Sequence, residues 1–246
     1  RLTEPAGLRE RALDALLAVA LALGAYALLG DVGFELTDEG YLWYGVQRAE
    51  LGEVPRLDFR GYDPGRYYWC VAWAPLFGTG LLGMRLSLAM YQAVGLFFGL
   101  RVARRALKPG QAGLPLLLVG LGVLLTVWVF PRQKVFEHTA VLINVWVVMR
   151  WLEQRDTRRA FAAGVWAGLA LFMGRNHALY AGLSSIAVIG WIGARESLAL
   201  CRVSLGGFSA GVAVGLLPTV AMMLFIPGLA ATNWELAIAL VHRSSN

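Results

Sequence analysis

Charged residues are scarce in this sequence. Only 15% of the 246 residues are Asp, Glu, Lys or Arg, whereas 58% are hydrophobic, and the mean hydropathy is +0.59. A soluble domain of this length carries about 25% charged residues and cannot bury so much apolar surface in one core. The composition therefore argues against an ordinary soluble domain and indicates an integral membrane protein.

Cysteine and histidine are also rare, with two and three copies respectively. The sequence lacks a Cys/His cluster with zinc-site spacing, and it lacks a P-loop, so these two motifs identify no function. The alternating hydrophobic pattern of a transmembrane barrel is missing as well. Because only helices and closed barrels satisfy backbone groups in lipid, we expect an all-α protein.

The hydrophobic residues gather in runs with short basic clusters at their ends. A helix needs about 20 residues to cross a membrane, and several of these runs are shorter. The net charge of +6 follows from basic clusters placed as the positive-inside rule predicts, so we expect membrane lipids and no nucleic acid as partners. The apolar runs lie near residues 12–30, 67–84, 86–100, 113–130, 138–149, 160–174, 178–194 and 203–226.

Segment 67–80 is the doubtful crossing, since it is rich in aromatic residues and interrupted by proline and glycine. If it crosses, the basic clusters at 101–108 and 150–159 lie outside, against the positive-inside rule. If it does not, they lie inside with the N-terminus. We therefore expect seven transmembrane helices, a cytoplasmic N-terminus and a long first outer loop, 31–85, whose amphipathic helices lie at the membrane interface. The aromatic residues of 67–80 are typical of an interfacial belt.

Residues 1–246 are expected to form a single transmembrane module. Because the chain begins at Arg1 and ends in a polar stretch at Asn246, we expect it to be the N-terminal part of a longer protein, truncated at its C-terminus. The topology places Cys70 outside and Cys201 inside, which excludes a disulfide between them.

The first outer loop contains half of the 16 acidic residues. After the pair Asp38 and Glu39, apolar residues recur at helical spacing, which predicts a short amphipathic helix lying on the membrane. Thr37 or Asp38 would be its N-cap, and Glu39 would sit in its first turn. The acid pair therefore has two interpretations. It caps a helix, or it supplies a carboxylate that takes a proton from an acceptor hydroxyl.

The same loop resembles the first periplasmic loop of GT-C membrane glycosyltransferases. The resemblance is carried by Asp38-Glu39-Gly40-Tyr41, Gly52-Glu53-Val54-Pro55, Asp58-Phe59 and the run from Tyr62 to Trp69. It is to the bacterial members related to the protein O-mannosyltransferases and to the aminoarabinose transferases of lipid A. Those enzymes share a seven-crossing module with two interfacial helices in this loop.

The resemblance implies sugar transfer from a polyprenyl-phosphate-linked donor to a hydroxyl of a lipid, glycan or protein acceptor, with inversion. The reaction would occur on the periplasmic or extracellular face of the plasma membrane, the inner membrane in a bacterium. The family's general base falls on Asp38, and its second acid falls on Glu39. Relatives often carry His-Pro-Pro or Lys-Pro-Pro where this chain has Asp63-Pro64-Gly65, so no basic phosphate contact is expected from this position, and Arg60 or Arg66 could substitute for it.

The short second outer loop contributes further candidates. Related enzymes tend to carry an acid there, and Glu137 is the only one in this loop, so we count it as catalytic. Arg132 and Lys134 could hold the departing lipid phosphate, where charge builds in the transition state. The alternative is that both bind lipid headgroups at the interface.

The third outer turn, Arg175-Asn176-His177, is polar between two apolar runs. Arg175 and His177 are expected to recognise phosphate, unless Arg175 merely reaches the interface and Asn176 forms the turn. No cofactor is required by the sequence, although a divalent cation could bind through Asp38 or Glu137.

Two other functions fit a polytopic membrane protein. A transporter or flippase for lipid-linked sugars would carry charges inside the membrane and two related halves, but no internal repeat is visible. A non-catalytic subunit of a membrane complex would not need an acidic outer loop. The concentration of acids in one loop favours the enzyme.

Overall fold

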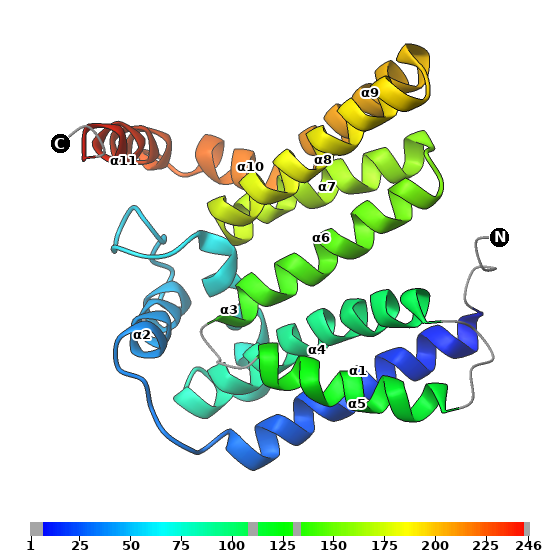
Figure 1. Ribbon diagram of the computed structural model, residues 1–246. Helices are drawn as coiled ribbons and strands as arrows, with labels where there is room; N and C mark the ends of the chain where they lie inside the picture. The colour runs from blue at the N-terminus through cyan, green and yellow to red at the C-terminus, as the bar shows by residue number, and fades with distance from the viewer. Residues whose placement is uncertain (1–6, 108–112, 130–133, 244–246) are drawn as a thin grey trace.

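The computed structural model describes residues 7–107, 113–129 and 134–243, which form eleven helices and no β-strand (Figure 1). The all-α expectation is confirmed for these residues. The helices are α1 (Leu8–Leu29), α2 (Asp38–Glu50), α3 (Pro64–Phe77), α4 (Leu81–Ala106), α5 (Leu114–Val129), α6 (Val135–Glu153), α7 (Thr157–Met173), α8 (Arg175–Arg195), α9 (Leu198–Gly215), α10 (Leu217–Phe225) and α11 (Leu229–Arg243).

Five of these helices, namely α1, α4, α6, α8 and α9, are long and apolar enough to cross a membrane. A sixth span results if α10 and α11, which meet at 109°, form one broken crossing. The helices α5 and α7 have 16 and 17 residues, which is near the lower limit for a span. Five or six spans are thus supported in the described part of the chain, and seven stays a prediction.

The apolar run predicted at 67–84 is divided in the structure. Helix α3 ends at Phe77, and Gly78 follows with a φ of 73°, so the backbone changes direction before α4 begins at Leu81. A left-handed φ is easy for glycine and disfavoured for other residues. The last predicted run, 203–226, is divided too, between α9 and α10.

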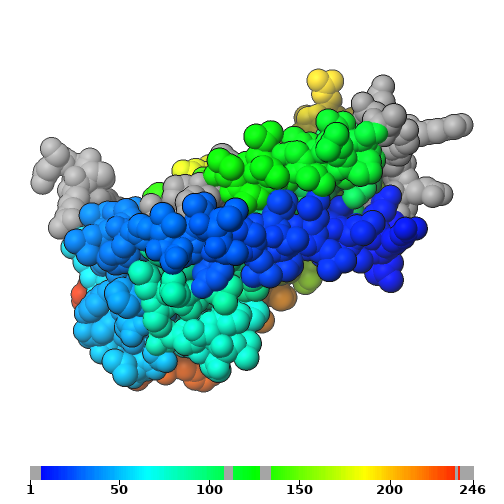
Figure 2. Space-filling view, turned by 90° about the horizontal axis from the view of Figure 1, so that it is seen from below, coloured from blue at the N-terminus to red at the C-terminus, as the bar shows by residue number. Residues whose placement is uncertain are grey.

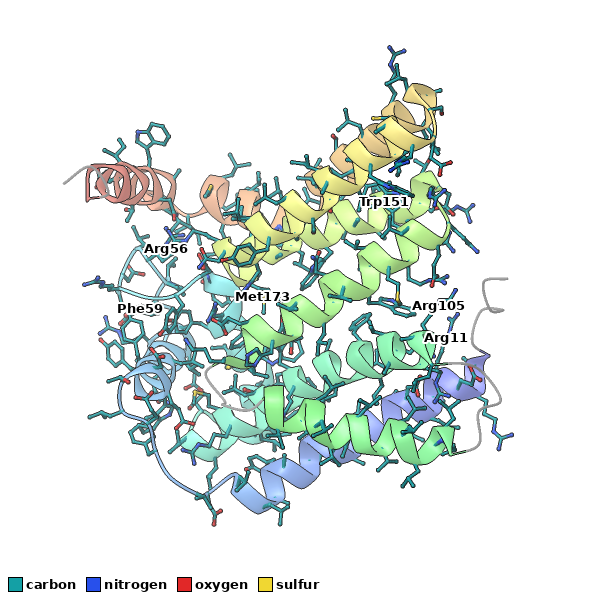
Figure 3. The ribbon with its side chains drawn as sticks, in the orientation of Figure 1. Arg11, Arg56, Phe59, Arg105, Trp151 and Met173 are labelled. Carbon is teal, nitrogen blue, oxygen red and sulfur yellow. The ribbon has the colours of Figure 1, made fainter. Side chains whose placement is uncertain are left out.

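The long helices run alternately in opposite directions between two ends of the molecule (Figure 1). The first, here called the loop end, contains α2, α3 and the turn between α7 and α8. The second, the basic end, contains the start of α1, the ends of α4 and α6, and the turn between α8 and α9. At the basic end, buried Asp14 binds Arg101 and Arg104, and Glu153 binds Arg105 (Figure 3).

Helices α7 and α9 make the closest helix–helix contact, through glycine. A Cβ atom on Gly164 would lie 2.0 Å from the carbonyl oxygen of Phe208, and one on Gly211 would lie 2.1 Å from that of Phe161. Cβ atoms on Gly168 and Gly215 would lie 2.6 and 2.2 Å from carbonyl oxygens of the opposite helix. Small residues spaced by four let membrane helices approach until their backbones touch. This contact fixes α7, whose C-terminal end reaches the loop end.

Helix α1 lies along one face of the molecule beside α5 (Figure 2). Only 17% of its most apolar stretch is buried within the protein, and its leucines, such as Leu13 and Leu16, are exposed. Apolar side chains in such a long exposed row fit a lipid environment. Buried Trp151, by contrast, stacks with Phe208 between α6 and α9, inside the second of two cores (Figure 3).

The outer loop is packed firmly on the helices. The predicted amphipathic helix is α2, but its apolar residues Leu42 and Val46 are buried against protein, which corrects the expectation that they face the membrane. Gly45 of α2 touches the ring of buried Tyr67 in α3, and Gly65 of α3 touches Met173 of α7. The loop therefore has a fixed position over the bundle. Cys70 and Cys201 are both free thiols.

Candidate functional site

The start of α2 is capped by Glu35, not by the two residues expected for this task. Thr37 occupies the N-cap position, but its side chain makes no capping bond to the helix. Instead, Glu35 Oε1 accepts from the Thr37 backbone N–H at 2.9 Å, and Oε2 accepts from those of Asp38 and Glu39 at 2.6 and 3.0 Å. A hydrogen bond from the Thr37 hydroxyl, together with these backbone bonds, lowers the pKa of Glu35 to about 2. The carboxylate of Asp38 is thus not used as a cap.

Asp38 faces two other segments at the loop end. The Tyr62 hydroxyl donates to Asp38 Oδ1 at 2.9 Å, and Lys134 Nζ lies 3.6 Å from Oδ2. The Asp38 side chain is 42% exposed, so it is accessible from outside. Burial and the bond to Asp38 raise the pKa of Tyr62 to about 12, which keeps this phenol protonated as a donor. The Asp38 carboxylate is therefore oriented by these two contacts and still accessible from outside.

Glu39, the second predicted acid, is fully buried. Arg85 of α4 donates from Nε to Oε1 and from its terminal nitrogen to Oε2, both at 2.8 Å. The two side chains are each only 2% exposed. A carboxylate held by both oxygens in this way is not open to substrate in this conformation. Because Arg85 fixes Glu39, the neighbouring residue Asp38 is also kept in position.

Arg66 contacts two other residues predicted for the site. Its guanidinium group is buried, forms an ion pair of 2.9 Å with Glu137 and lies 3.4 Å from Nε2 of His177. The same group donates to the carbonyl of Met173 and stacks over the ring of Tyr62 at 5.1 Å. Arg66, Glu137 and His177 thus form one cluster, which adjoins Asp38 through Tyr62. Of the two basic residues considered near Pro64, Arg66 faces inward and Arg60 is exposed.

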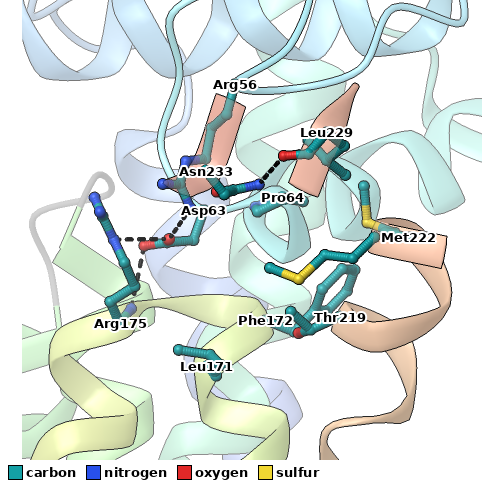
Figure 4. A pocket seen from close by; sticks show the side chains of 11 residues that line it. Arg56, Asp63, Pro64, Leu171, Phe172, Arg175, Thr219, Met222, Leu229 and Asn233 are labelled. Carbon is teal, nitrogen blue, oxygen red and sulfur yellow. Dashed lines mark hydrogen bonds and ion pairs between the residues drawn. The ribbon is translucent and has the colours of Figure 1, made fainter. Parts of the chain in front are cut away.

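Arg175 belongs to a third group of charges, which is centred on Asp63 (Figure 4). Asp63 is buried and accepts from the Arg175 backbone N–H at 3.2 Å, with the Arg175 side chain also 3.2 Å away. Arg56 lies 3.5 Å from the same carboxylate. These residues line a cavity of about 180 Å³. The sequence did not single out Arg56, because one arginine among several in the loop carries no distinguishing signal.

Arg132 lies outside the described residues. Among those residues, no group of three or more His, Cys, Asp and Glu side chains could hold a metal ion. The two acids considered for a cation are directed at different basic groups, Asp38 at Lys134 and Glu137 at Arg66. The arrangement is better suited to anions and to proton transfer than to a divalent cation.

Comparisons of the chain with protein-family models, with curated proteins and with solved structures find no match. The resemblance to GT-C glycosyltransferases expected from the loop residues stays a prediction. In its described residues, the structure defines a class: an all-α protein with five helices able to cross a membrane, or six spans if α10 and α11 form one, and a polar cluster at one end.

Proposed function

We propose that the protein is a membrane glycosyltransferase that moves a sugar from a polyprenyl-phosphate-linked donor to an acceptor hydroxyl, with Asp38 as the general base. The observation that supports this most is the state of Asp38. Its carboxylate is free of the helix cap, half-exposed, and oriented by Tyr62 and Lys134. A general base needs this combination of access and fixed direction.

The reaction is a single displacement. The acceptor oxygen attacks the anomeric carbon while Asp38 takes the hydroxyl proton, and the bond between that carbon and the phosphate oxygen breaks. The electron pair leaves with the polyprenyl phosphate, and the configuration inverts. Lys134 and Arg175 are exposed cations at this end, and they stabilise the negative charge of the leaving group. Arg66, Glu137, His177 and Glu39 fix the surrounding elements.

The membrane arrangement belongs to the same proposal. Helices α1 and α4 to α9 make seven crossings, with α5 and α7 as short ones, and the loop end faces the non-cytoplasmic side of the plasma membrane. The alternating directions of these helices and the arginines gathered at the basic end support this orientation.

Cysteine labelling tests the orientation. In a background with Cys70 and Cys201 replaced by serine, single cysteines replace Arg175 at the loop end or Arg195 at the basic end. A membrane-impermeant maleimide should label Arg175→Cys in intact cells and Arg195→Cys only after permeabilisation. The reverse pattern would overturn the orientation, and labelling of both from outside would overturn the seven crossings.

Turnover of Asp38→Asn tests the base. Membranes containing the protein are supplied with a panel of radiolabelled polyprenyl-phosphate sugars, and transfer is compared for wild type, Asp38→Asn and Asp31→Asn. Asp31 is an exposed acid of the same loop and serves as the control. Because general-base catalysis contributes about 10²–10⁴-fold, Asp38→Asn should lose at least about 100-fold.

Two outcomes would count against the proposal. Wild-type turnover in Asp38→Asn, at equal protein level, would remove Asp38 from the chemistry. Absence of transfer by wild type across the whole panel would remove the enzymatic function and favour a transporter of lipid-linked sugars.

A further inference from the structure

The cavity beside Asp63 has two unlike halves (Figure 4). One half is formed by charged groups of the outer loop and of the first turn of α8. The other is formed by apolar side chains from the end of α7 and from the bent pair α10 and α11, among them Leu171, Met222 and Leu229. A ligand that fills it must therefore be polar at one end and apolar at the other.

The charged half has an excess of positive charge. Arg56 and Arg175 share one carboxylate, that of Asp63, from which their nearest nitrogen atoms lie 3.5 and 3.2 Å away. Burial, and then the like charge of the neighbouring Arg175, lower the pKa of Arg56. Each guanidinium carries five N–H donors, and Asp63 cannot satisfy them all. An added anion would accept hydrogen bonds from the donors that remain.

The backbone of Arg56 is strained in a way that presents its side chain to this cavity. Among the described residues, Arg56 is the only one other than glycine with a positive φ, at 72°. Such a conformation is uncommon for a side chain of this size and persists where surrounding contacts enforce it, often at binding sites. Here the Arg56 N–H bonds the carbonyl of Phe59 at 2.9 Å, and the guanidinium lies at the cavity wall (Figure 4).

The apolar half contains one polar atom that the protein leaves unsatisfied. Thr219 Oγ1 of α10 is buried and has no hydrogen-bond partner among the described residues. Buried hydroxyl groups are nearly always hydrogen-bonded, so an exception needs an explanation. The thioethers of Met222 and Met223 next to it are flexible and adapt to an apolar chain of irregular shape.

We propose that this cavity binds a lipid phosphate, with one phosphate group between Arg56 and Arg175 and its apolar chain along α7 and α10. A free phosphate ion leaves the apolar half empty, and an uncharged lipid leaves the two guanidinium groups without an anion. Only the role of the lipid rests on the proposed function, in which it would be the sugar donor or the released carrier. Binding itself requires no transfer reaction.

Binding is measured on the whole protein by native mass spectrometry after release from detergent micelles. Three probes are added separately, namely farnesyl phosphate, farnesol and inorganic phosphate. Farnesyl phosphate should be retained at least tenfold more strongly than either of the others. Equal retention of farnesol would show an apolar hole only, and equal retention of inorganic phosphate would show a site for free anions. Either result overturns the proposal.

Variants locate the site. Arg175→Gln should weaken farnesyl phosphate binding at least tenfold, whereas Arg195→Gln, an exposed arginine at the other end of the same helix, should not. Arg56→Gly is the sharper variant, because glycine accepts the positive φ without strain. It should lose binding while the melting temperature of the free protein stays equal or rises. Wild-type binding in both Arg56→Gly and Arg175→Gln would overturn the proposal.

The two proposals fail separately. If farnesyl phosphate binds as described but no sugar is transferred by wild type, the enzymatic function fails and the lipid site stands. If transfer is observed and depends on Asp38, while Arg56→Gly and Arg175→Gln bind farnesyl phosphate normally, the lipid site fails and the enzymatic function stands.

Discussion

Arg85 of α4 holds Glu39 of α2 by both carboxylate oxygens, although 46 residues separate the two along the chain. The same guanidinium group also donates to the carbonyls of Gly30 and Gly33, at 2.7 and 2.5 Å. One buried side chain thus joins the end of α1, the first turn of the outer loop and the start of α2 to α4. Because Asp38 is the residue before Glu39, this junction determines where Asp38 lies.

Arg85→Gln is expected to destabilise the protein strongly, since it leaves the Glu39 carboxylate buried without its cation. Breaking a buried pair from one side lowers the free energy of unfolding by about 3–5 kcal/mol. The double variant Glu39→Gln/Arg85→Gln should lose less than Arg85→Gln alone, because no charge is left unpaired. Thermal unfolding of the purified protein in detergent measures both.

The matched control is the pair of Arg155 and Glu196, whose side chains are about one-third exposed. An exposed ion pair contributes about 0–1 kcal/mol, so Arg155→Gln should change the melting temperature little. If Arg85→Gln and Arg155→Gln lose the same stability, the Arg85–Glu39 junction does not anchor the loop.

The cap formed by Glu35 predicts acid sensitivity at the start of α2. Its pKa is lowered from 4.5 to about 2 in the folded protein. The stabilisation is therefore fully present above pH 4.5 and is lost as the pH falls towards 2. Glu35→Ala should show, at neutral pH, the low amide protection at Thr37 to Glu39 that wild type shows only in acid, where protection is the exchange rate relative to that of an unfolded peptide at the same pH.

Asp31→Ala is the control for this effect, because Asp31 is an exposed acid of the same loop. Its exchange should match wild type at every pH. Slow exchange at Thr37 to Glu39 in Glu35→Ala would mean that the first turn of α2 is held by contacts other than this cap.

The helix starting near Asp38 was predictable because apolar residues recur at a period that a helix imposes. Its capping group was not, since Glu35 reaches the first-turn N–H groups from two residues before Thr37, outside the usual N-cap position. The apolar face of this helix was expected to lie on the membrane, but its residue Leu42 is buried against protein, because periodicity shows which face is apolar and not what covers it. Tertiary pairs such as Arg85 with Glu39 can be identified only in the folded chain, because hydropathy carries no information on which residues become partners.

The candidate site, too, was predictable from the sequence only in part. Asp38 was identified from the loop motif, and the structure brings Arg66, Glu137 and His177 together as one cluster. The cavity was not foreseen, because Arg56, Arg175 and Thr219 come from three separate regions and meet only where α10 packs near the loop. The break between α9 and α10 lies inside one continuous apolar run, where hydropathy gives no boundary.

The bond between Tyr62 and Asp38 predicts an alkaline transition. The pKa of Tyr62 is raised from 10.0 to about 12, first by burial and then by the bond and charge of Asp38. The stabilisation is thus present below pH 10 and is lost as the pH rises to about 12. Tyr62→Phe should be less stable than wild type by about 1 kcal/mol at pH 8, with the difference narrowing above pH 10.

Melting temperatures of the two proteins across this range measure the effect, and Tyr180→Phe, at an exposed tyrosine of α8, serves as the control. A difference between wild type and Tyr62→Phe that stays constant up to pH 12 would contradict the bond. The same variant should lower sugar transfer without changing donor binding, since Tyr62 acts by orienting Asp38.

The glycine contact between α7 and α9 allows a test with a control on the same helix. In Gly211→Ala the new Cβ would lie 2.1 Å from the Phe161 carbonyl oxygen, which belongs to rigid helix backbone, so the two helices must separate. Gly206 has nothing within 4 Å of its Cβ position, and Gly206→Ala should be tolerated. We expect Gly211→Ala to lower the melting temperature clearly, with a loss of about 1–3 kcal/mol typical of overpacking.

Because α7 carries Leu171 and Phe172 to the cavity, farnesyl phosphate binding should weaken in Gly211→Ala as well. Equal stability of the two variants would show that α7 and α9 are not in backbone contact.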